Sequence, residues 1–540
     1  MSTRTLRIAA PSPWPAAPAW RDRRTLAWVA LLCIGQVALW GLSIGLNYQS
    51  PEIDSAEQFV WAFSMENGYW KLPPLPSWIM HALIQAFGPS VALPFVAAQA
   101  CIVIALALTW RLGCEFMAPR RALIAMALTS LVAYHNVGAD SFNHNTVLLP
   151  FQAATLLLFY LATRRGAWHL WALTGLFAGL AMLVKYVALV PLAGMLLYFV
   201  CDRSLHHRRA LAGLLLATSI AALVLTPHAI WLHATNFLPF RYAHSVTQEL
   251  PGAWAALSSL AGFLLLQAVR VLPFLAGLRF VLARRTADLA TDPASHAVTH
   301  PATATPLPAL HGRDRLFLWV AALSPLGLTA AFGLISETAL QGRWGTNAFL
   351  LSGLLAMALS RRPDTALMWR RTVQVVVLVQ VLMCAGQTIS KTVVADHFER
   401  PTRANFPGAL LARLSQETWK AYADVPLRLV VSDIWLGGNL IANSPQRLAV
   451  LIDGHHLKSP WVKAQAVETC GALILDDTTE DRAGHAQHNP ALEALLARAD
   501  ASGTWVLPWA RPKFRADGPD RGVIRWAIIK PEAGAVCALP

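Results

Sequence analysis

A short polar segment follows the first long apolar stretch and holds the side chains best suited to chemistry. Asp54 and Glu57 are three residues apart, which places both carboxylates on one face of a helix. Lys71 follows, and the Pro73–Pro74 step then ends any helix. Carboxylates held beside apolar side chains acquire shifted pKa values and can transfer protons. We expect Asp54 to do acid–base chemistry and Glu57 and Lys71 to bind substrate. The alternative is a solvated interfacial helix followed by a lysine that only reaches lipid headgroups.

The composition indicates what holds this segment in place. Of the 540 residues, 55% are hydrophobic and only 14% are charged, whereas a soluble domain carries about 25% charged residues. Apolar stretches of about 15 to 25 residues recur as far as residue 390, and that length crosses a ~30 Å hydrocarbon core. We therefore expect a polytopic α-helical membrane domain over residues 26–390. Its eleven predicted spans are 26–46, 90–110, 121–138, 146–163, 168–184, 187–201, 210–232, 256–280, 316–336, 346–360 and 372–388.

The distribution of positive charge predicts the orientation in the membrane. The formal net charge is +14, but the arginines stand in pairs between apolar stretches, as at 120–121, 164–165 and 208–209. This is the positive-inside pattern of a plasma membrane protein, and it argues against nucleic acid as a partner. We expect segment 1–25 to be cytoplasmic and the first span to be retained. The first outer loop, residues 47–88, then lies outside.

The other predicted outer loops carry further polar candidates. Asn143 and His144 stand beside a span entrance, where they more readily order a loop than bind a metal, because a second ligand at metal-binding spacing is missing. Lys185, followed by Tyr186, interrupts a long apolar stretch and therefore faces a cavity or marks the membrane surface.

Two arginines complete the set of candidates. Arg270 lies near the middle of the predicted span 256–280, where it either pairs with an acid of a neighbouring helix or binds a phosphate in a cavity. Arg343 and Trp344 combine a cation for phosphate with a ring on which a sugar stacks.

After residue 390 the pattern changes to short apolar strands separated by helical stretches. We expect residues 391–540 to form a small α/β domain on the outer side, with strands in 426–435, 447–454, 471–477, 503–509 and 522–530. The stretch Asp433 to Asn439, DIWLGGN, is interpreted as a turn after a strand. Cys470 and Cys537 are able to pair outside the cytoplasm, although the sequence leaves this open.

Several motifs together resemble one known family. They are DSAE at 54–57, GYWKLPPL at 68–75, FNHNTVLLP at 142–150 and GLAMLVKY at 179–186. The chain is similar to the C-type integral-membrane glycosyltransferases, a superfamily that includes protein mannosyltransferases, aminoarabinose transferases and lipid A–core glycosyltransferases. The resemblance covers residues 24–371 and is specific for the superfamily, not for the sugar. In one departure, Leu72 stands where the family usually has His or Lys before the first proline.

The resemblance implies an activity and roles for individual residues. Asp54 matches the family's general base or acceptor-orienting acid, Lys185 matches its motif lysine, and Arg270 or Arg343 would bind the donor phosphate. The implied enzyme is an inverting glycosyltransferase of the bacterial inner membrane. It moves a sugar from a polyprenyl-phosphate donor to lipid A, core oligosaccharide or another envelope acceptor on the periplasmic face.

Other readings stay open at this point. A protein O-mannosyltransferase differs only in the acceptor, whereas a transporter or flippase of polyprenyl-linked substrates predicts paired broken helices. A structural or regulatory subunit predicts that Asp54 is dispensable. The predicted partners are membrane lipid, the polyprenyl-phosphate donor and a lipid or glycan acceptor, and nucleic acid is not expected. No cofactor is certain, and a divalent metal is left possible.

Overall fold

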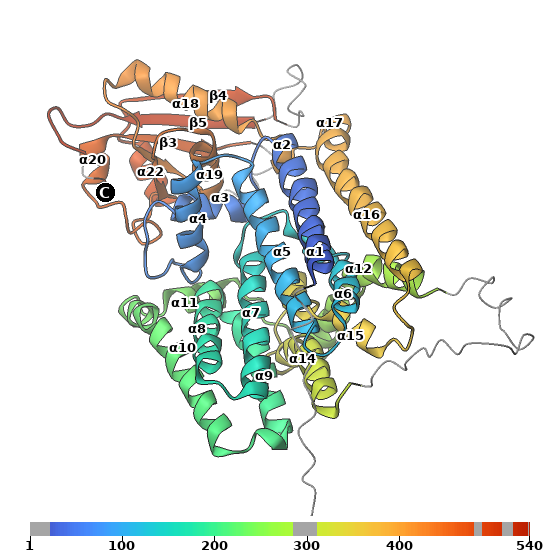
Figure 1. The fold of residues 1–540 in the computed structure, drawn as a ribbon. Helices are drawn as coiled ribbons and strands as arrows, with labels where there is room; N and C mark the ends of the chain where they lie inside the picture. Colours follow the sequence, from blue (N-terminus) through green and yellow to red (C-terminus); the bar gives the residue numbers. More distant parts are fainter. Residues whose placement is uncertain (1–21, 284–309, 480–488, 510–521, 538, 540) are drawn as a thin grey trace, which may run out of the picture.

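The computed structural model describes residues 22–283, 310–479, 489–509, 522–537 and 539. A bundle of long helices carries a small sheet domain at one end (Figure 1). Seven helices are long and apolar enough to cross a membrane, and an eighth is possible if one bent pair forms a single span. The chain is thus a multi-pass α-helical membrane protein with a small C-terminal α/β domain, as its composition predicts. The N-terminal segment expected in the cytoplasm lies almost wholly outside the described residues.

The helices of the bundle match most of the predicted spans. The long ones are α1 with η2 and α2 (Arg23–Asn47), α5 (Leu93–Gly113), α7 (His144–Arg165), α10 (Arg208–Ala234), α12 (Ala253–Leu282), α14 (Gly312–Ile335) and α16 (Ala366–Ile389), which continues through η8 (Ser390–Val394) and α17 (Ala395–His397). Two apolar helices are shorter, α8 (Trp168–Val184) and α9 (Leu189–Cys201). An additional helix, α11 (Leu238–Val246), lies between α10 and α12.

Two predicted spans are not single long helices in the structure, and the count of eleven stays a prediction. The segment 121–138 contains α6 (Pro119–Thr129), which is bent by 87° from the 3-10 turns over residues 133–139. His135 and Asn136 cause the bend, because their side chains hydrogen-bond the carbonyl oxygens of Thr129 and Ser130 and compete with the helix. The segment 346–360 contains only the eight-residue helix α15 (Ser352–Leu359).

The first outer loop folds into two helices that pack between the bundle and the sheet domain. These are α3 (Ile53–Trp61) and α4 (Leu75–Phe87), and the proline pair starts α4, as its sequence predicts. Every side chain of α3 from Ser55 to Trp61 is buried. The alternative of a solvated interfacial helix is therefore wrong.

The C-terminal domain contains all five predicted strands in one sheet of order β2-β1-β3-β5-β4. The strands are β1 (Leu429–Ser432), β2 (Ala449–Ile452), β3 (Ala472–Asp477), β4 (Ala501–Leu507) and β5 (Gly522–Ile529). β1 runs parallel to β2 and β3, whereas β5 is antiparallel to β3 and β4. Its helices are α18 (Gly408–Tyr422), α19 (Ile434–Asn443), α20 (Ala466–Cys470) and α22 (Pro490–Leu496). Cys470 and Cys537 form a disulfide.

The stretch after β1 corrects one prediction, because it is the helix α19 and not a turn. Asp433 caps this helix by accepting a hydrogen bond from the Leu436 amide (2.7 Å). A Cβ at Gly438 would lie 2.5 Å from the Cβ of Ala56 on α3. The glycine is thus present for close helix packing, which outweighs its poor helix propensity. Through this contact the C-terminal domain packs against the helix that carries Asp54.

Gly438→Leu is expected to loosen this contact. The added side chain would meet backbone atoms of Ala56 at 2.6 Å, so α3 and α19 must separate. We expect a loss of about 3 kcal/mol in unfolding free energy, at the upper end for overpacked sites. Thermal unfolding of the purified protein measures it. Gly327→Leu is the control, because a Cβ there meets nothing within 4 Å, and equal stability of the two variants would contradict the expected packing.

Candidate active site

The segment that contains Asp54 is held by a second loop of the bundle. The Asn143 Nδ2 donates a hydrogen bond to the Asp54 Oδ2 (3.2 Å). One residue further along α3, the Ser55 hydroxyl accepts from the Phe142 amide (2.9 Å) and lies 3.2 Å from the Ser141 hydroxyl. These bonds fix the loop 139–145 against the first turn of α3. The Asp54 side chain is only partly buried, so its carboxylate stays open to a ligand.

Glu57 and Lys71 form an ion pair beside this carboxylate. The Lys71 Nζ lies 2.6 Å from the Glu57 Oε1, and Glu57 is 6% exposed. Burial raises the pKa of Glu57, against the opposing effect of Lys71. Burial disfavours the Lys71 ammonium, but the Glu57 carboxylate outweighs it and raises the pKa of Lys71. Lys71 also lies 4.7 Å from the Trp70 ring, so the predicted acid and lysine are held together by charge and by an aromatic neighbour.

Lys185 reaches the same site from the break between α8 and α9. Its Nζ donates to the Asn145 Oδ1 (2.6 Å), which joins it to the loop that holds Asp54. Burial lowers the pKa of Lys185 to about 8, with a further lowering by Arg343 and an opposing effect of Asp54. The charges of Arg343 and Asp54 therefore both influence the pKa of the Lys185 ammonium. A lysine so perturbed binds an anion more strongly than a fully hydrated one.

Arg343 and Trp344 lie in the 3-10 segment η7 (Gly342–Ala348). The Arg343 side chain is exposed and its Nε donates to the Gln341 Oε1 (2.9 Å). Its positive charge lowers the pKa of Glu57 as well as that of Lys185, so it belongs to the same group of charges. The Trp344 ring packs 6.2 Å from Phe332, on a neighbouring helix.

Two of the predicted residues lie behind the site, where they hold the first outer loop. His144 is 3% exposed, and its Nε2 lies 3.2 Å from the Pro73 carbonyl oxygen. The Tyr186 hydroxyl lies 2.8 Å from the His228 Nε2, and the other ring nitrogen of His228 reaches the Asn67 carbonyl oxygen (2.6 Å). Tyr186 and His228 thus form a chain of hydrogen bonds from α10 to the loop of Lys71.

Arg270 lines a cavity whose lining includes none of these residues. Its guanidinium carbon lies 5.5 Å from the centre of the Tyr134 ring, and the side chain lines this cavity together with Asp140 and Lys391. The acid partner expected for an arginine in mid-span is missing among the described residues.

A further ionic cluster was not predicted from the sequence. The Lys391 Nζ lies 2.6 Å from the Glu52 Oε1 and 2.9 Å from the Asp140 Oδ2. It ties α16 to the residue before α3 and to the loop 139–145. A lysine after a long apolar stretch was the only signal, and it gave no hint of its partners. Within the described residues, no group of three or more His, Cys, Asp or Glu side chains is arranged to hold a metal ion.

The geometry can now be compared with known proteins. Residues 71–231 match the family model of dolichyl-phosphate-mannose-protein mannosyltransferases. The chain is 24% identical to the lipopolysaccharide core galacturonosyltransferase RgtA of Rhizobium johnstonii, over 95% of this chain and 99% of that one. It is 25% identical to the lipid A galacturonosyltransferase RgtD of the same organism, over 37% of this chain and 42% of the relative. The crystal structure of ArnT from Cupriavidus metallidurans bound to undecaprenyl phosphate has the same fold, with a TM-score of 0.57 and 14% identity over 93% of this chain and 98% of ArnT.

The chain has the fold and the relatives of the C-type integral-membrane glycosyltransferases. The resemblance inferred from its motifs is therefore confirmed. The match to the family model begins at Lys71 and includes Asn143 and Lys185.

Proposed function

We propose that the chain is an inverting glycosyltransferase that uses a polyprenyl-phosphate-linked sugar. The observation that carries this proposal is the gathering of one partly exposed carboxylate, Asp54, with three cations from separate segments. Lys71 comes from the first outer loop, Lys185 from the α8–α9 break and Arg343 from η7. A glycosyl transfer from a lipid phosphate needs this combination, because a base activates the acceptor and cations stabilise the leaving phosphate.

Each group has a defined part in the proposed reaction. Asp54 accepts the proton of the acceptor hydroxyl, and the hydroxyl oxygen attacks the anomeric carbon of the donor sugar. The bond from that carbon to the phosphate oxygen breaks on the opposite face, which inverts the anomeric configuration. Lys71, Lys185 and Arg343 stabilise the negative charge of the departing polyprenyl phosphate. Asn143 donates to Asp54 and orients its second oxygen toward the acceptor.

The relatives suggest the acceptor and the cellular location. RgtA and RgtD are named as transferring galacturonic acid to the lipopolysaccharide core and to lipid A, respectively. We propose lipid A or core oligosaccharide as the acceptor, and a uronic acid as the first sugar to test. The positive-inside pattern supports a bacterial inner-membrane protein whose Asp54 site and C-terminal domain lie on the periplasmic side.

Comparison of glycoconjugates from a deletion strain tests this function. Mass spectrometry of lipid A, core oligosaccharide and glycoproteins is expected to show one missing sugar on lipid A or core, restored by the wild-type chain. A missing sugar on proteins instead would favour the mannosyltransferase alternative, which the match to the protein-mannosyltransferase model supports. An unchanged set of glycoconjugates would refute the transferase activity.

The lowered pKa of Lys185 predicts a pH dependence. The ammonium that would bind the donor phosphate is present below its pKa of about 8 and is lost as the pH rises through that value. We expect kcat/KM for the donor to fall about tenfold per pH unit above about pH 8, far below the usual lysine range near 10.4. Initial rates between about pH 6.5 and 9.5 measure it. Lys185→Arg keeps its charge and is expected to remove the decline. A constant wild-type value up to about pH 9.5 would contradict the lowered pKa of Lys185, and a decline that persists in Lys185→Arg would show that another group causes it.

A further inference from the structure

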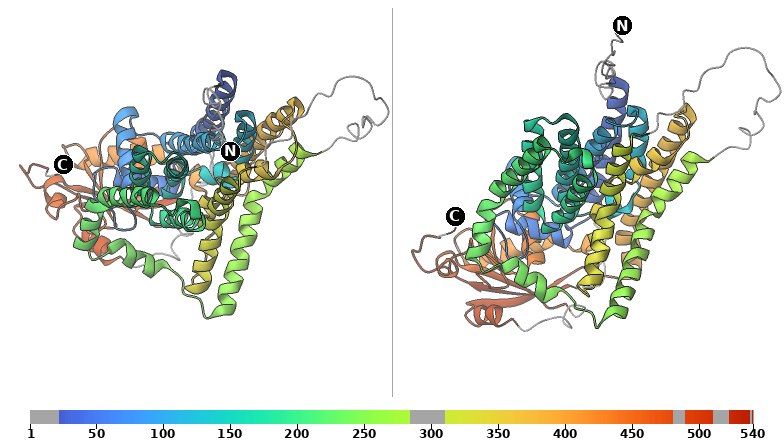
Figure 2. Two further views of the ribbon diagram at one scale, coloured as in Figure 1. Left: turned by 60° about the horizontal axis from the view of Figure 1, so that its bottom comes forward. Right: turned by 90° about the horizontal axis from the view of Figure 1, so that it is seen from below.

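A polar cavity shares a loop with the Asp54 site. Its volume is about 540 Å³, and it is an open cavity lined by α12, α16 with η8, and the loop 137–140. Figure 2 shows α12 in yellow-green and α16 in gold running side by side. Asp140, Arg270 and Lys391 supply the charged groups of its lining. The loop is shared, because Asp140 lines this cavity while Asn143, three residues later, contacts Asp54. A ligand in the cavity would therefore lie next to the reaction site.

Arg270 is the cation of this cavity that is available to a ligand. Lys391 is already paired with two carboxylates, those of Glu52 and Asp140, and so has no charge left for a ligand. Arg270, in contrast, makes neither an ion pair nor a hydrogen bond within the described residues, and its guanidinium packs over the Tyr134 ring. It belongs to α12, a helix long and apolar enough to span a membrane. An uncompensated cation in such a helix is costly unless it faces a water-filled cavity or an anionic ligand.

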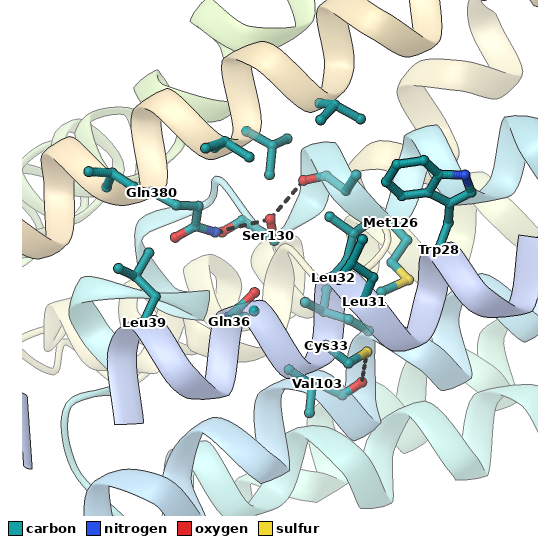
Figure 3. Close-up of a pocket in the computed structure, with 17 residues that line it drawn as sticks. Trp28, Leu31, Leu32, Cys33, Gln36, Leu39, Val103, Met126, Ser130 and Gln380 are labelled. Atoms are coloured by element: carbon teal, nitrogen blue, oxygen red, sulfur yellow. Dashed lines mark hydrogen bonds between the residues drawn. The ribbon is translucent and has the colours of Figure 1, made fainter. Parts of the chain in front are cut away.

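The same helix α16 also lines an apolar groove. This groove has a volume of about 330 Å³ and lies among α1, α5, α6 and α16. Figure 3 shows its lining, which is almost wholly apolar apart from Gln36, Ser130 and Gln380. On α16, Val373, Val377 and Gln380 line the groove and Gln387 lines the polar cavity, which Lys391 of the continuing helix η8 lines as well. These five positions follow one another at helical spacing, so one side of α16 passes from an apolar groove to a charged cavity.

An apolar groove that leads to a charged cavity fits an amphiphile with an anionic headgroup. We propose that the cavity binds the phosphate or carboxylate of the acceptor lipid through Arg270, with a hydrocarbon chain of that lipid in the groove. The assignment of this cavity to the acceptor lipid, and not to the donor lipid, rests on the proposed function. A transfer brings two lipid substrates to Asp54 at once, and Lys71, Lys185 and Arg343 already provide the cations for the donor phosphate. Arg270 is then a specificity-determining residue for anionic acceptors.

Lipid binding to the full-length protein in nanodiscs, without donor sugar, tests the proposal. The probes are diphosphorylated lipid A, its fully dephosphorylated form, and undecaprenyl phosphate. Arg270→Gln is expected to weaken binding of diphosphorylated lipid A by about tenfold or more, the range for a lost charge-assisted hydrogen bond. Binding of the dephosphorylated form and of undecaprenyl phosphate is expected to stay unchanged. Arg279→Gln is the matched control, because this exposed arginine lies on the same helix outside the cavity.

A second variant fills the cavity without a change of charge. A Cβ at Gly386 meets nothing within 4 Å, and Gly386 lines the cavity from α16. Gly386→Leu is therefore compatible with the fold and is expected to weaken both forms of lipid A but not undecaprenyl phosphate. Gly262→Leu on α12 also has open space, lies outside the cavity lining, and is expected to bind all three probes normally.

Three results would overturn the proposal. The first is a loss of undecaprenyl phosphate binding in Arg270→Gln, which would assign the cavity to the donor. The second is an equal effect of Arg270→Gln on phosphorylated and dephosphorylated lipid A. The third is wild-type protein that does not discriminate between these two forms. Because the assay needs no turnover, a failure of the proposed transferase activity would show separately, as an absence of transferred sugar.

Discussion

Asp54→Asn is expected to abolish sugar transfer while the protein folds normally. The amide keeps the size of the carboxylate and its contact with Asn143, but it cannot accept the proton of the acceptor hydroxyl. We expect kcat to fall by about 10²- to 10⁴-fold, the usual contribution of a general base. Single-turnover rates with saturating donor and acceptor measure the chemical step, and thermal unfolding checks the fold.

Glu66→Gln is the matched control for this variant. Glu66 lies in the same outer loop, and its carboxylate accepts from the Ser64 hydroxyl (2.7 Å) without any contact to Asp54. We expect nearly wild-type rates. If Asp54→Asn retains more than about a tenth of the wild-type rate, proton transfer by Asp54 is not required, since a general base contributes at least about a hundredfold. A structural or regulatory subunit would then explain the chain better.

Lys71→Met is expected to destabilise the protein as well as weaken donor binding. The substitution leaves the Glu57 carboxylate, which is 6% exposed, without its ion-pair partner. Breaking a buried pair costs about 3–5 kcal/mol, and the partial exposure of Lys71 reduces this to about 2–3 kcal/mol. Because burial raises the pKa of Glu57, the loss is present when Glu57 is charged and disappears as the pH falls through that raised pKa. Unfolding free energies at several pH values measure it.

The double variant Lys71→Met/Glu57→Gln separates the two roles of Lys71. It removes the unpaired charge and is expected to recover stability to within about 1 kcal/mol of the wild type, because an apolar and neutral pair replaces the ions. The KM for the donor is expected to stay raised in the double variant, since the cation is still missing. A double variant in which both stability and KM recover would assign Lys71 a structural role alone.

Local sequence was informative wherever a residue's own chemistry or its spacing settles its environment. Long apolar stretches must lie in hydrocarbon, and alternating or continuous short apolar runs pair into a sheet, so the bundle and all five strands were predictable. The proline pair had to end one segment and start α4, because proline cannot continue a helix. The roles of Asp54 and Lys185 follow from the motifs that carry the family resemblance and stay predictions.

Local patterns were misleading where long-range contacts decide. A glycine pair ordinarily predicts a turn. Gly438 nevertheless lies within a helix, because a residue without a side chain is required where α19 packs closely against the backbone of α3. The segment 121–138 is apolar enough to cross a membrane, but His135 and Asn136 bond to nearby carbonyl oxygens and bend it. The intrinsic preference of a residue for a helix or a turn contributes little free energy, so a few tertiary contacts override it.

The sequence by itself thus determined a membrane-embedded glycosyltransferase fold with an acid in its first outer loop. Only the tertiary structure decided which charges meet: Lys71 with Glu57, Lys185 with the loop of Asp54, and Lys391 with two carboxylates far away in the chain. It also placed Arg270 in the lining of a cavity together with Asp140 and Lys391. The physical reason is that the cost of a buried charge depends on its neighbours in space, and these neighbours are set by helix packing and not by spacing along the chain.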